Sequence, residues 1–286
     1  MGIKQTKELT EKQTEHNMLM EYIQQDCYVD ITKKIEYPPV VLSYGEKVLS
    51  SSKGDILVPI ALGTFGNISV ITAPPKTMKT FFVSLLASAF LSGSNIYGGD
   101  IKGHRGNGHL LHIDTEQGLW HSQKVFARPF LMDSNIPIEK YHTFALRTIA
   151  FKERLQFIEY YLKEKIDTPS LVIVDGVADL LADVNNIEQS NELVSTLMRI
   201  STQYNCHIIN VIHQNYGSAK LGTGHLGSAL EKKAETVIQL EANTVNRNWV
   251  TVKCGRSRGY CFDTFSFEVN DAGLPQIVND LYDPLK

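Results

Sequence analysis

Lys79 and Thr80 stand side by side at the expected start of a helix, directly after a short turn. The surrounding stretch, from Ile68 to Phe90, reads ISVITAPPKTMKTFFVSLLASAF and predicts an apolar strand, the turn and the helix. A lysine and a hydroxyl at this point can contact phosphate oxygens and Mg²⁺, because the amino end of a helix also favours anions. The residue types therefore indicate a phosphate-binding turn.

The usual spacing of such a turn is G-x-x-x-x-G-K-[ST], and both of its glycines are missing here. Ala73 and Met78 stand in their places, and a side chain at Met78 costs on the order of 1–3 kcal/mol if the backbone conformation is unfavourable. Lys76 adds a second cation at the mouth of the turn. From this segment alone, a plain strand–turn–helix junction is an equally good interpretation. The candidate phosphate-contacting residues are Ala73, Pro74, Pro75, Lys76, Thr77, Met78, Lys79, Thr80 and Phe81.

Three further segments end expected strands with polar residues. SLVIVD ends in Asp175, which can hold Mg²⁺ together with Thr80 if its strand lies beside that of the turn. LLHIDTE ends in Glu116, a candidate base for a water that attacks a γ-phosphate. HIINVIH ends in His213, which can sense that phosphate and relay its loss to the next loop.

A fourth segment, VTVKCGRSRGYCF, carries Lys253, Arg256 and Arg258 near a strand end. Two arginines that are two residues apart on a strand point to the same side, from where they can reach the γ-phosphate of an adjacent subunit. Each of the four segments alone has a structural explanation: a capping aspartate, a solvated acidic turn, a structural histidine or a basic hairpin tip. Their joint order, with helix-length spacings between them, favours a nucleotide site.

Expected strands and helices alternate through the middle of the chain, and this alternation positions the candidate residues. It predicts an α/β fold with a central, mostly parallel sheet flanked by helices. The strand-like run from Trp249 onward predicts an antiparallel C-terminal edge of that sheet. Residues 1–35 are polar with a partial apolar stripe and predict an N-terminal helical extension, which leaves 36–286 as the main domain.

The composition is that of an ordinary globular protein, with 286 residues, 43% of them hydrophobic and 21% charged. The net charge of -3 argues against a polycation that coats nucleic acid, although a local basic groove is compatible with it. Cys27, Cys206, Cys254 and Cys261 show no C-x-x-C spacing, so we expect reduced thiols and neither a zinc site nor a disulfide framework. Without a membrane-spanning run or a signal peptide, a cytoplasmic location away from membranes is expected.

In these residues the chain resembles the RecA-like P-loop ATPases, especially the hexameric RepA/DnaB-type replicative helicases. The stretch GTFGNISVITAPPKTMKTF also resembles the AAA-family ATPases carried by mobile elements of Bacteroides-type bacteria. The likeness covers roughly residues 55–270 and makes 36–286 a RecA-like P-loop NTPase domain.

The resemblance implies ATP and Mg²⁺ as ligands and assigns a role to each candidate residue. Thr80 and Asp175 are the implied metal-binding residues. Arg256 and Arg258 match the basic residues that act across the subunit interface in this family. The implied catalytic residues are Lys79, Glu116, His213, Arg256 and Arg258.

The expected function is that of an ATP-hydrolysing motor or loader acting on DNA, more on single than on double strands, in replication or mobilisation of a genetic element. It is expected to work as a homo-oligomer such as a hexameric ring. The candidate DNA-contacting loops follow Asp175 and His213, with Lys220 as their clearest cation. Two alternatives stay open. One is a degenerate nucleotide-binding module that assembles with DNA or protein partners without efficient hydrolysis, and the other is a RecA relative that works on protein.

Overall fold

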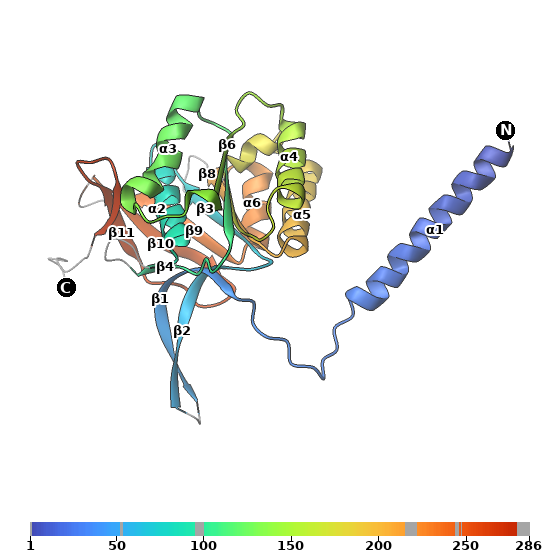
Figure 1. Ribbon diagram of the computed structural model, residues 1–286, viewed down its shortest axis with the longest axis horizontal. Coiled ribbons are helices and arrows are strands. Elements are labelled where there is room, and N and C mark those ends of the chain that lie inside the picture. Colours follow the sequence, from blue (N-terminus) through green and yellow to red (C-terminus); the bar gives the residue numbers. More distant parts are fainter. Residues whose placement is uncertain are drawn as a thin grey trace. The chain divides into compact units, whose positions relative to one another are not determined.

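The computed structural model describes residues 2–51, 54–94, 100–214, 222–243, 246 and 248–278. The chain divides into two compact units, residues 1–37 and 38–286. The first unit contains the helix α1 (Gly2–Asp26), which lies within the segment 1–35 that was predicted as a helical extension (Figure 1). None of the helices in the described ranges, α1 included, is both long enough and apolar enough to cross a bilayer.

The second unit is built on a nine-stranded sheet with the order β12-β11-β10-β9-β3-β8-β7-β5-β6 (Figure 1). Six neighbouring strands are parallel: β3 (Ile68–Ala73), β5 (His109–Asp114), β6 (Tyr141–Ala145), β7 (Pro169–Asp175), β8 (His207–His213) and β9 (Thr236–Ala242). Three antiparallel strands extend the sheet beyond β9: β10 (Trp249–Ser257), β11 (Phe265–Val269) and β12 (Pro275–Val278). The predicted mostly parallel sheet with an antiparallel C-terminal edge is confirmed.

Helices cover both faces of this sheet (Figure 1). On one face lie α2 (Lys79–Ser92) and α3 (Leu119–Met132). On the other lie α4 (Phe151–Glu164), α5 (Ile187–Gln203) and α6 (Gly224–Lys233). Two short 3₁₀ turns, η1 (Ile138–Lys140) and η2 (Val177–Leu180), complete the helical elements of the described chain.

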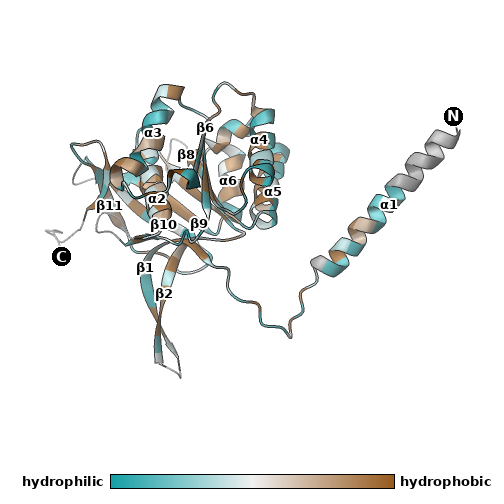
Figure 2. Ribbon diagram, in the orientation of Figure 1, coloured by the Kyte–Doolittle hydropathy of each residue, from teal (hydrophilic) through white to brown (hydrophobic). Residues whose placement is uncertain are grey.

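The parallel strands are buried on both faces, which explains their continuous apolar sequences. In β3, Ile71 and Ala73 join the core beneath α2, whereas Ile68 and Val70 join the core beneath α5 and α6. This alternation follows the two-residue period of a strand. Figure 2 shows the result as hydrophobic strands in the centre of the unit.

A separate three-stranded sheet has the order β2-β1-β4. Its strands are β1 (Val40–Ser51), β2 (Gly54–Thr64) and β4 (Ile101–Gly103), and the β1–β2 hairpin extends away from the main sheet (Figure 1). The ring of Tyr44 stacks on Phe265 of β11 at 4.0 Å between centroids, which ties the base of the hairpin to the main sheet.

The strand order corrects one prediction. Asp175 was expected on the strand next to that of the phosphate-binding turn, but β8 lies between β3 and β7. The sequence did not reveal this order, because β7 and β8 are apolar runs of equal length. The register nevertheless aligns Ala73 with His213 and Asp114 with Asp175, so that all these residues share the carboxyl edge of the sheet.

Candidate functional site

The turn between β3 and α2 holds two non-glycine residues in the left-handed backbone region. Lys76 has a φ of 64° and Met78 a φ of 53°, while Thr77 between them has no positive φ. Such alternation points successive amides into one concavity, which favours anions. Each left-handed residue of this kind costs about 1–2 kcal/mol. The Thr77 hydroxyl donates to the carbonyl of Pro74 at 2.8 Å and helps to hold the turn.

The amides of this turn are available to a ligand. No described residue accepts a hydrogen bond from the backbone N–H groups of 76–80. The first amides of a helix have no partner within the helix, and the dipole of the 14-residue α2 adds positive partial charge at the same place. The missing glycines have therefore not removed the anion-binding geometry of the turn.

A pocket of about 400 Å³ opens over this turn at the carboxyl edge of the sheet. It brings together most of the residues predicted for the site. Ala73, Pro74 and Pro75 do not line the pocket, and the carbonyl of Ala73 instead accepts the amide of Gln214. The pocket is lined by Lys76, Thr77, Met78, Lys79, Thr80, Phe81, Glu116, Gln117, Val125, Arg128, Asp175 and His213.

Lys79, His213 and Glu116 form a connected chain in this pocket. The Lys79 Nζ lies 2.8 Å from Nδ1 of His213, and Nε2 of the same ring lies 3.5 Å from Oε1 of Glu116. Burial lowers the pKa of Lys79, and the charges of Glu116 and Asp175 counteract this effect. The hydrogen bond from His213 lowers the pKa of Glu116, which keeps this carboxylate ionised.

Asp175 is a buried carboxyl group at the end of β7. Burial, followed by the charges of Asp114 and Glu116, raises its pKa to about 7. No described side chain donates a hydrogen bond to its carboxylate, so this group is open to a cation. Mg²⁺ is usually held by one or two carboxylates together with substrate phosphates and waters. The described residues contain no cluster of three or more His, Cys, Asp or Glu that could bind a metal alone, and Asp175 with Thr80 fits the phosphate-assisted type of site.

The residues around Asp175 and Glu116 fix the two carboxylates relative to each other. The carboxylate of Asp114 accepts hydrogen bonds from the amides of Glu116 and Gln117 and from the hydroxyl of Ser122. After Asp175, Gly176 has a φ of 98°, and a Cβ at this position would lie 2.3 Å from Oγ1 of Thr115. A glycine is therefore required where the end of β7 passes the end of β5.

Arg128 of α3 is a pocket residue that the sequence reasoning missed. Its guanidinium carbon lies 3.8 Å from the centre of the Phe81 ring, and Nη1 lies 3.4 Å from Oγ of Ser84. Burial lowers its pKa, and no described carboxylate pairs with it. A guanidinium fixed in this way suits a phosphate oxygen. The available signal was its position three residues after the buried Val125, which places both on one helix face.

Arg256 and Arg258 do not line this pocket. Arg256 pairs with Val237, and the amide of Arg258 donates to the carbonyl of Glu235, just before β9 begins. Because β9 runs parallel to β3, both arginines lie toward the amino ends of the parallel strands, away from the turn between β3 and α2.

The expected same-side orientation of the two arginine side chains stays a prediction, because no described contact relates the two guanidinium groups to each other. The register is irregular between Cys254 and Arg256, and β10 ends before Arg258. The guanidinium of Arg258 donates to the carbonyl of Lys233, in the last turn of α6. The sequence contains no signal for this irregularity other than Gly255.

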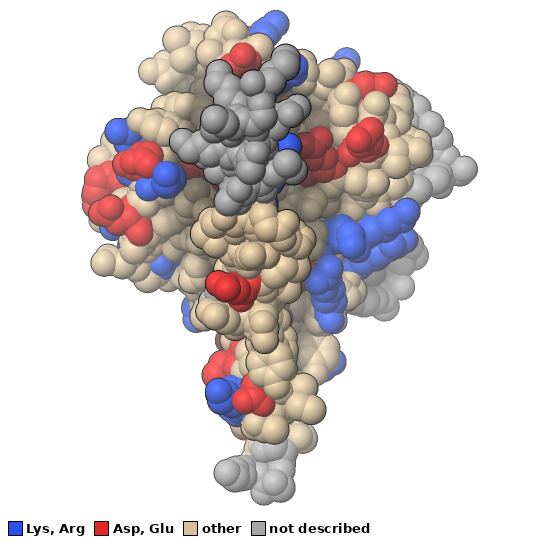
Figure 3. Space-filling view, turned by 90° about the vertical axis from the view of Figure 1, so that its right-hand side faces the viewer, with Lys and Arg blue, Asp and Glu red and all other residues tan. Residues whose placement is uncertain are grey.

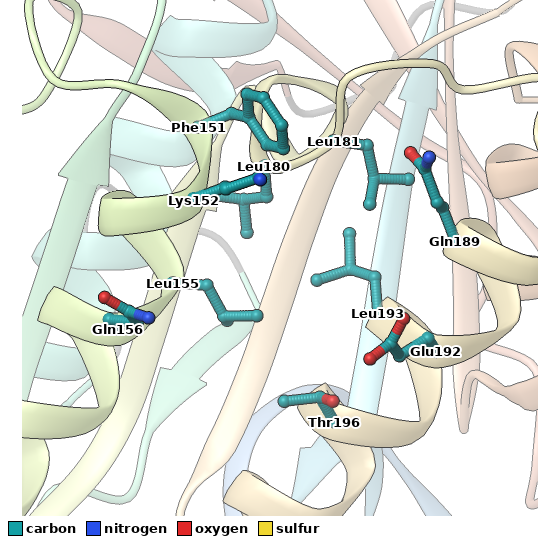
Figure 4. A pocket seen from close by; sticks show the side chains of 10 residues that line it. All are labelled: Phe151, Lys152, Leu155, Gln156, Leu180, Leu181, Gln189, Glu192, Leu193 and Thr196. Carbon is teal, nitrogen blue, oxygen red and sulfur yellow. The ribbon is translucent and has the colours of Figure 1, made fainter.

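A second pocket of about 430 Å³ lies between α4 and α5 (Figure 4). Leu155, Leu181 and Leu193 point into it, and Lys152 is its one basic lining residue. An apolar floor with a single cation does not suit a polyphosphate. The pocket over Lys79 is therefore the better candidate of these two for a polyphosphate.

One predicted DNA-contacting loop lies largely outside the described residues. Lys220 and most of the loop after His213 fall in 215–221. The loop after Asp175 is described and contains η2. The assignment of both loops to DNA stays a prediction.

Comparisons with known proteins agree with this geometry. A sequence profile of the AAA domain family matches residues 63–219, which contain the turn, Glu116, Asp175 and His213. No curated protein matches the sequence. Among solved structures, the crystal structure of the RadB recombinase matches with a TM-score of 0.52 and 16% identity, over 75% of this chain and 92% of that one. At this identity the match concerns the fold, and it confirms the predicted RecA-like core.

Proposed function

Because this chain belongs to the AAA domain family and has a RecA-like fold, we propose that it binds ATP with Mg²⁺ and hydrolyses the γ-phosphate bond. One observation carries this proposal. A single pocket joins the free amides at the start of α2 to Lys79, Asp175 and Glu116. These are the groups that phosphoryl transfer needs for binding charge, holding metal and activating water.

The binding roles follow from the positions. The amides of 76–80 and the amino end of α2 hold the phosphate oxygens, and the ammonium of Lys79 neutralises the charge that develops between the β- and γ-phosphates. Thr80 and Asp175 would hold Mg²⁺, which would supply further positive charge to the phosphates. The lowered pKa of Lys79 reflects burial, and a bound polyphosphate would favour its charged form again.

Glu116 is the candidate base that accepts a proton from the attacking water. It reaches the pocket from the end of β5, and its hydrogen bond with His213 keeps it ionised. His213 bridges the base and Lys79, so a bound phosphate competes with the imidazole, 2.8 Å away, for the ammonium of Lys79. This competition suits a residue that reports the state of the site to the loop after β8.

Arg256 and Arg258 are proposed to complete the pocket of a neighbouring protomer. Their position toward the amino ends of the parallel strands supports a trans role, since they are remote from their own phosphate-binding turn. A surface on one side of a protomer that meets a different surface of the next gives a head-to-tail assembly, which closes as a ring or continues as a filament. A homo-oligomer of this kind, with a hexameric ring as one form, is therefore part of the proposal.

The proposed substrate of the motor or loader is DNA, in the replication or mobilisation of a genetic element. The resemblance to replicative helicases and to ATPases of mobile elements supports this part. Although the net charge is -3, Lys and Arg side chains gather in one area of the face in Figure 3. A local area of this kind can bind phosphates, and such binding weakens steeply with salt.

The test is ATP turnover by the full chain with and without single-stranded DNA, alongside calorimetric titration with ATP. Turnover that DNA stimulates supports the proposal. ATP binding without phosphate release supports the alternative of a degenerate module, in which Ala73 and Met78 replace the usual glycines. Turnover that is the same with and without DNA at low salt favours a protein substrate.

A further inference from the structure

Two cysteines face each other beside the proposed trans arginines. Sγ of Cys254 in β10 lies 2.7 Å from Sγ of Cys261 in the loop that follows. Both are free thiols, Cys261 exposed and Cys254 half-buried. The eight residues from one to the other read CGRSRGYC, so Arg256 and Arg258 lie inside the segment that the two sulfur atoms close.

We propose that Cys254 and Cys261 form a reversible disulfide, a redox modification site that closes the loop around Arg256 and Arg258. The sulfur atoms need to approach by less than about 1 Å, since a disulfide bond measures about 2.05 Å. Cytosolic disulfides are rare as structural bonds but occur as transient redox sensors. A pair in contact, with one of its two thiols exposed, is suited to the transient kind.

The backbone on each side of the cysteine pair is held in place by packing and strand pairing. Cys254 pairs with Ile238 across β9 and β10. Phe262, directly after Cys261, is buried and lies 5.9 Å from the ring of Tyr44 and 6.0 Å from that of Phe265, between centroids. The contact between the thiols is therefore held from both ends, while the segment between them is exposed or only partly covered.

The oxidant is a peroxide, and the exposed thiol reacts first. The sulfur of Cys261, as the thiolate, attacks hydrogen peroxide, the O–O bond breaks, and a sulfenic acid and hydroxide result. The sulfur of Cys254 then attacks the sulfenic sulfur, the S–O bond breaks, and the departing oxygen takes the proton of Cys254. Two thiols and one peroxide give one disulfide and two waters, with two electrons passing from sulfur to oxygen. A dithiol reductant returns two electrons and two protons.

The assignment of first and second thiol follows from burial. Burial, with the contact to Cys261 as a second cause, raises the pKa of Cys254 to about 12. A thiol that rarely ionises is a poor first target for peroxide. Cys27 and Cys206 lack an equivalent partner, and Cys206 is buried. Cys27 is exposed and serves as the matched control for oxidation of a lone thiol.

The consequence for activity rests on the proposed function. In this structure the guanidinium of Arg258 is bound to the carbonyl of Lys233 in its own chain. To reach a neighbour's phosphate, this arginine must leave that contact, and the loop must move with it. A disulfide across the loop restrains this movement. Oxidation is therefore expected to lower turnover several-fold while leaving ATP binding unchanged.

The experiment uses the full chain, treated with hydrogen peroxide, digested with trypsin without reduction and analysed by mass spectrometry. Trypsin cleaves after Arg256 and Arg258, so fragments that carry Cys254 and Cys261 stay joined only through a disulfide. After peroxide treatment, joined fragments are expected from the native sequence and from Cys27→Ser, and dithiothreitol separates them. Cys254→Ser leaves a sulfenic acid on Cys261 that dimedone traps, and Cys261→Ser gives no joined fragments.

Unjoined fragments from the oxidised native sequence overturn the disulfide site, as does an equal yield from Cys261→Ser. Turnover is then compared before oxidation, after oxidation and after reduction, with Cys254→Ser as the insensitive variant. Unchanged turnover on oxidation overturns the claim that the disulfide restrains the loop of Arg256 and Arg258. A reduced protein that hydrolyses no ATP overturns the proposed function instead, because the joined fragments are detected without nucleotide.

Discussion

Lys79 and His213 lie in direct contact, with Nζ of the lysine 2.8 Å from Nδ1 of the imidazole. The register of β3 and β8 makes this contact possible, because Ala73 and His213 are paired at the ends of these strands. The same imidazole is 3.5 Å from Glu116. The lysine proposed to contact phosphate and the glutamate proposed to activate water are thus linked through one side chain.

Replacing Lys79 with alanine is expected to abolish ATP turnover. Among the described lysines and arginines, Lys79 is the one that is both buried and next to the amides at the start of α2. The loss of a preorganised charge contact of this kind lowers kcat by about 10²–10³-fold. The control is Lys76→Ala, which removes an exposed cation at the mouth of the turn and is expected to change turnover less than tenfold. Equal losses in the two variants would contradict the role of Lys79.

The pH dependence of magnesium-nucleotide binding is expected to reflect Asp175. With a pKa of about 7, this carboxyl group is protonated below neutral pH, and Mg²⁺ binding must displace that proton. Affinity for Mg-ATP should fall by up to about tenfold for each pH unit below 7 and level off above it. Calorimetry from pH 5.5 to 8.5 measures the slope. Asp175→Asn gives the remaining slope that the nucleotide itself causes, and identical slopes would speak against Asp175 as the metal ligand.

The same group gives a stability prediction of known sign. Asp175 has a raised pKa in the folded protein and an ordinary one, 3.8, in the unfolded chain. Between these values the folded state holds a proton that the unfolded chain has released, so its free energy of unfolding falls as the pH rises through this window. Without nucleotide, Asp175→Asn should flatten this decline in urea titrations at pH 5 and pH 7.

Mixing two inactive variants tests the shared site. Glu116→Gln keeps the shape of the side chain but removes the base, with an expected loss in turnover of about 10²–10⁴-fold. Arg256→Ala removes a residue proposed to act on the neighbour. Mixed protomers should recover part of the activity, since some interfaces then combine an intact Glu116 pocket with an intact arginine loop. Activity that stays at the level of the separate variants would argue against action in trans.

Met78 is expected to be conformationally strained yet replaceable. Met78→Gly removes the cost of a side chain in the left-handed region, about 1–2 kcal/mol. It also increases the conformational entropy of the unfolded chain, which lowers stability by about 0.5–1 kcal/mol. The contact of Met78 with the core is lost as well. The free energy of unfolding should therefore change by less than about 1 kcal/mol. Met78→Val places a β-branched residue at φ 53° and should destabilise by at least about 1–2 kcal/mol. Chemical denaturation compares the three proteins.

Arg128 is expected to contribute to nucleotide affinity. Its guanidinium rests on Phe81 and has no described acidic partner. Arg128→Ala should weaken ATP binding by about 1.5–3 kcal/mol, the usual range for a hydrogen bond to a charged group. Arg128→Lys keeps the charge but loses the planar fork, so it should recover only part of the loss. Titrations with ATP and adenosine separate a phosphate contact, which affects ATP alone, from a contact with the base.

Much of the fold and of the pocket was predictable, because polar residues at the ends of parallel strands lie together at one edge of the sheet. Glu116, Asp175 and His213 were identified in this way, and the pocket contains all three. The alternation of apolar strands and amphipathic helices likewise indicated the layers. These features depend on local patterns, which a single sequence carries.

The remaining features depend on pairing between distant segments. β7 and β8 have similar apolar sequences, so their order beside β3 is decided by packing. The left-handed Lys76 and Met78 contradict the glycine rule, because the surrounding strand and helix hold the turn in place. Arg256 lies far from the turn because β10 pairs antiparallel with β9, and no residue type in the sequence predicts this pairing.

Because Arg256 lies far from the turn of its own chain, the number of complete sites in the proposed assembly depends on how the assembly ends. In an open stack, the protomer at one end has no neighbour to donate arginines, so a stack of n protomers contains n − 1 finished sites. In a closed ring of n protomers, all n sites are complete. Specific activity should then climb with protein concentration while stacks lengthen, and become independent of dilution once rings close.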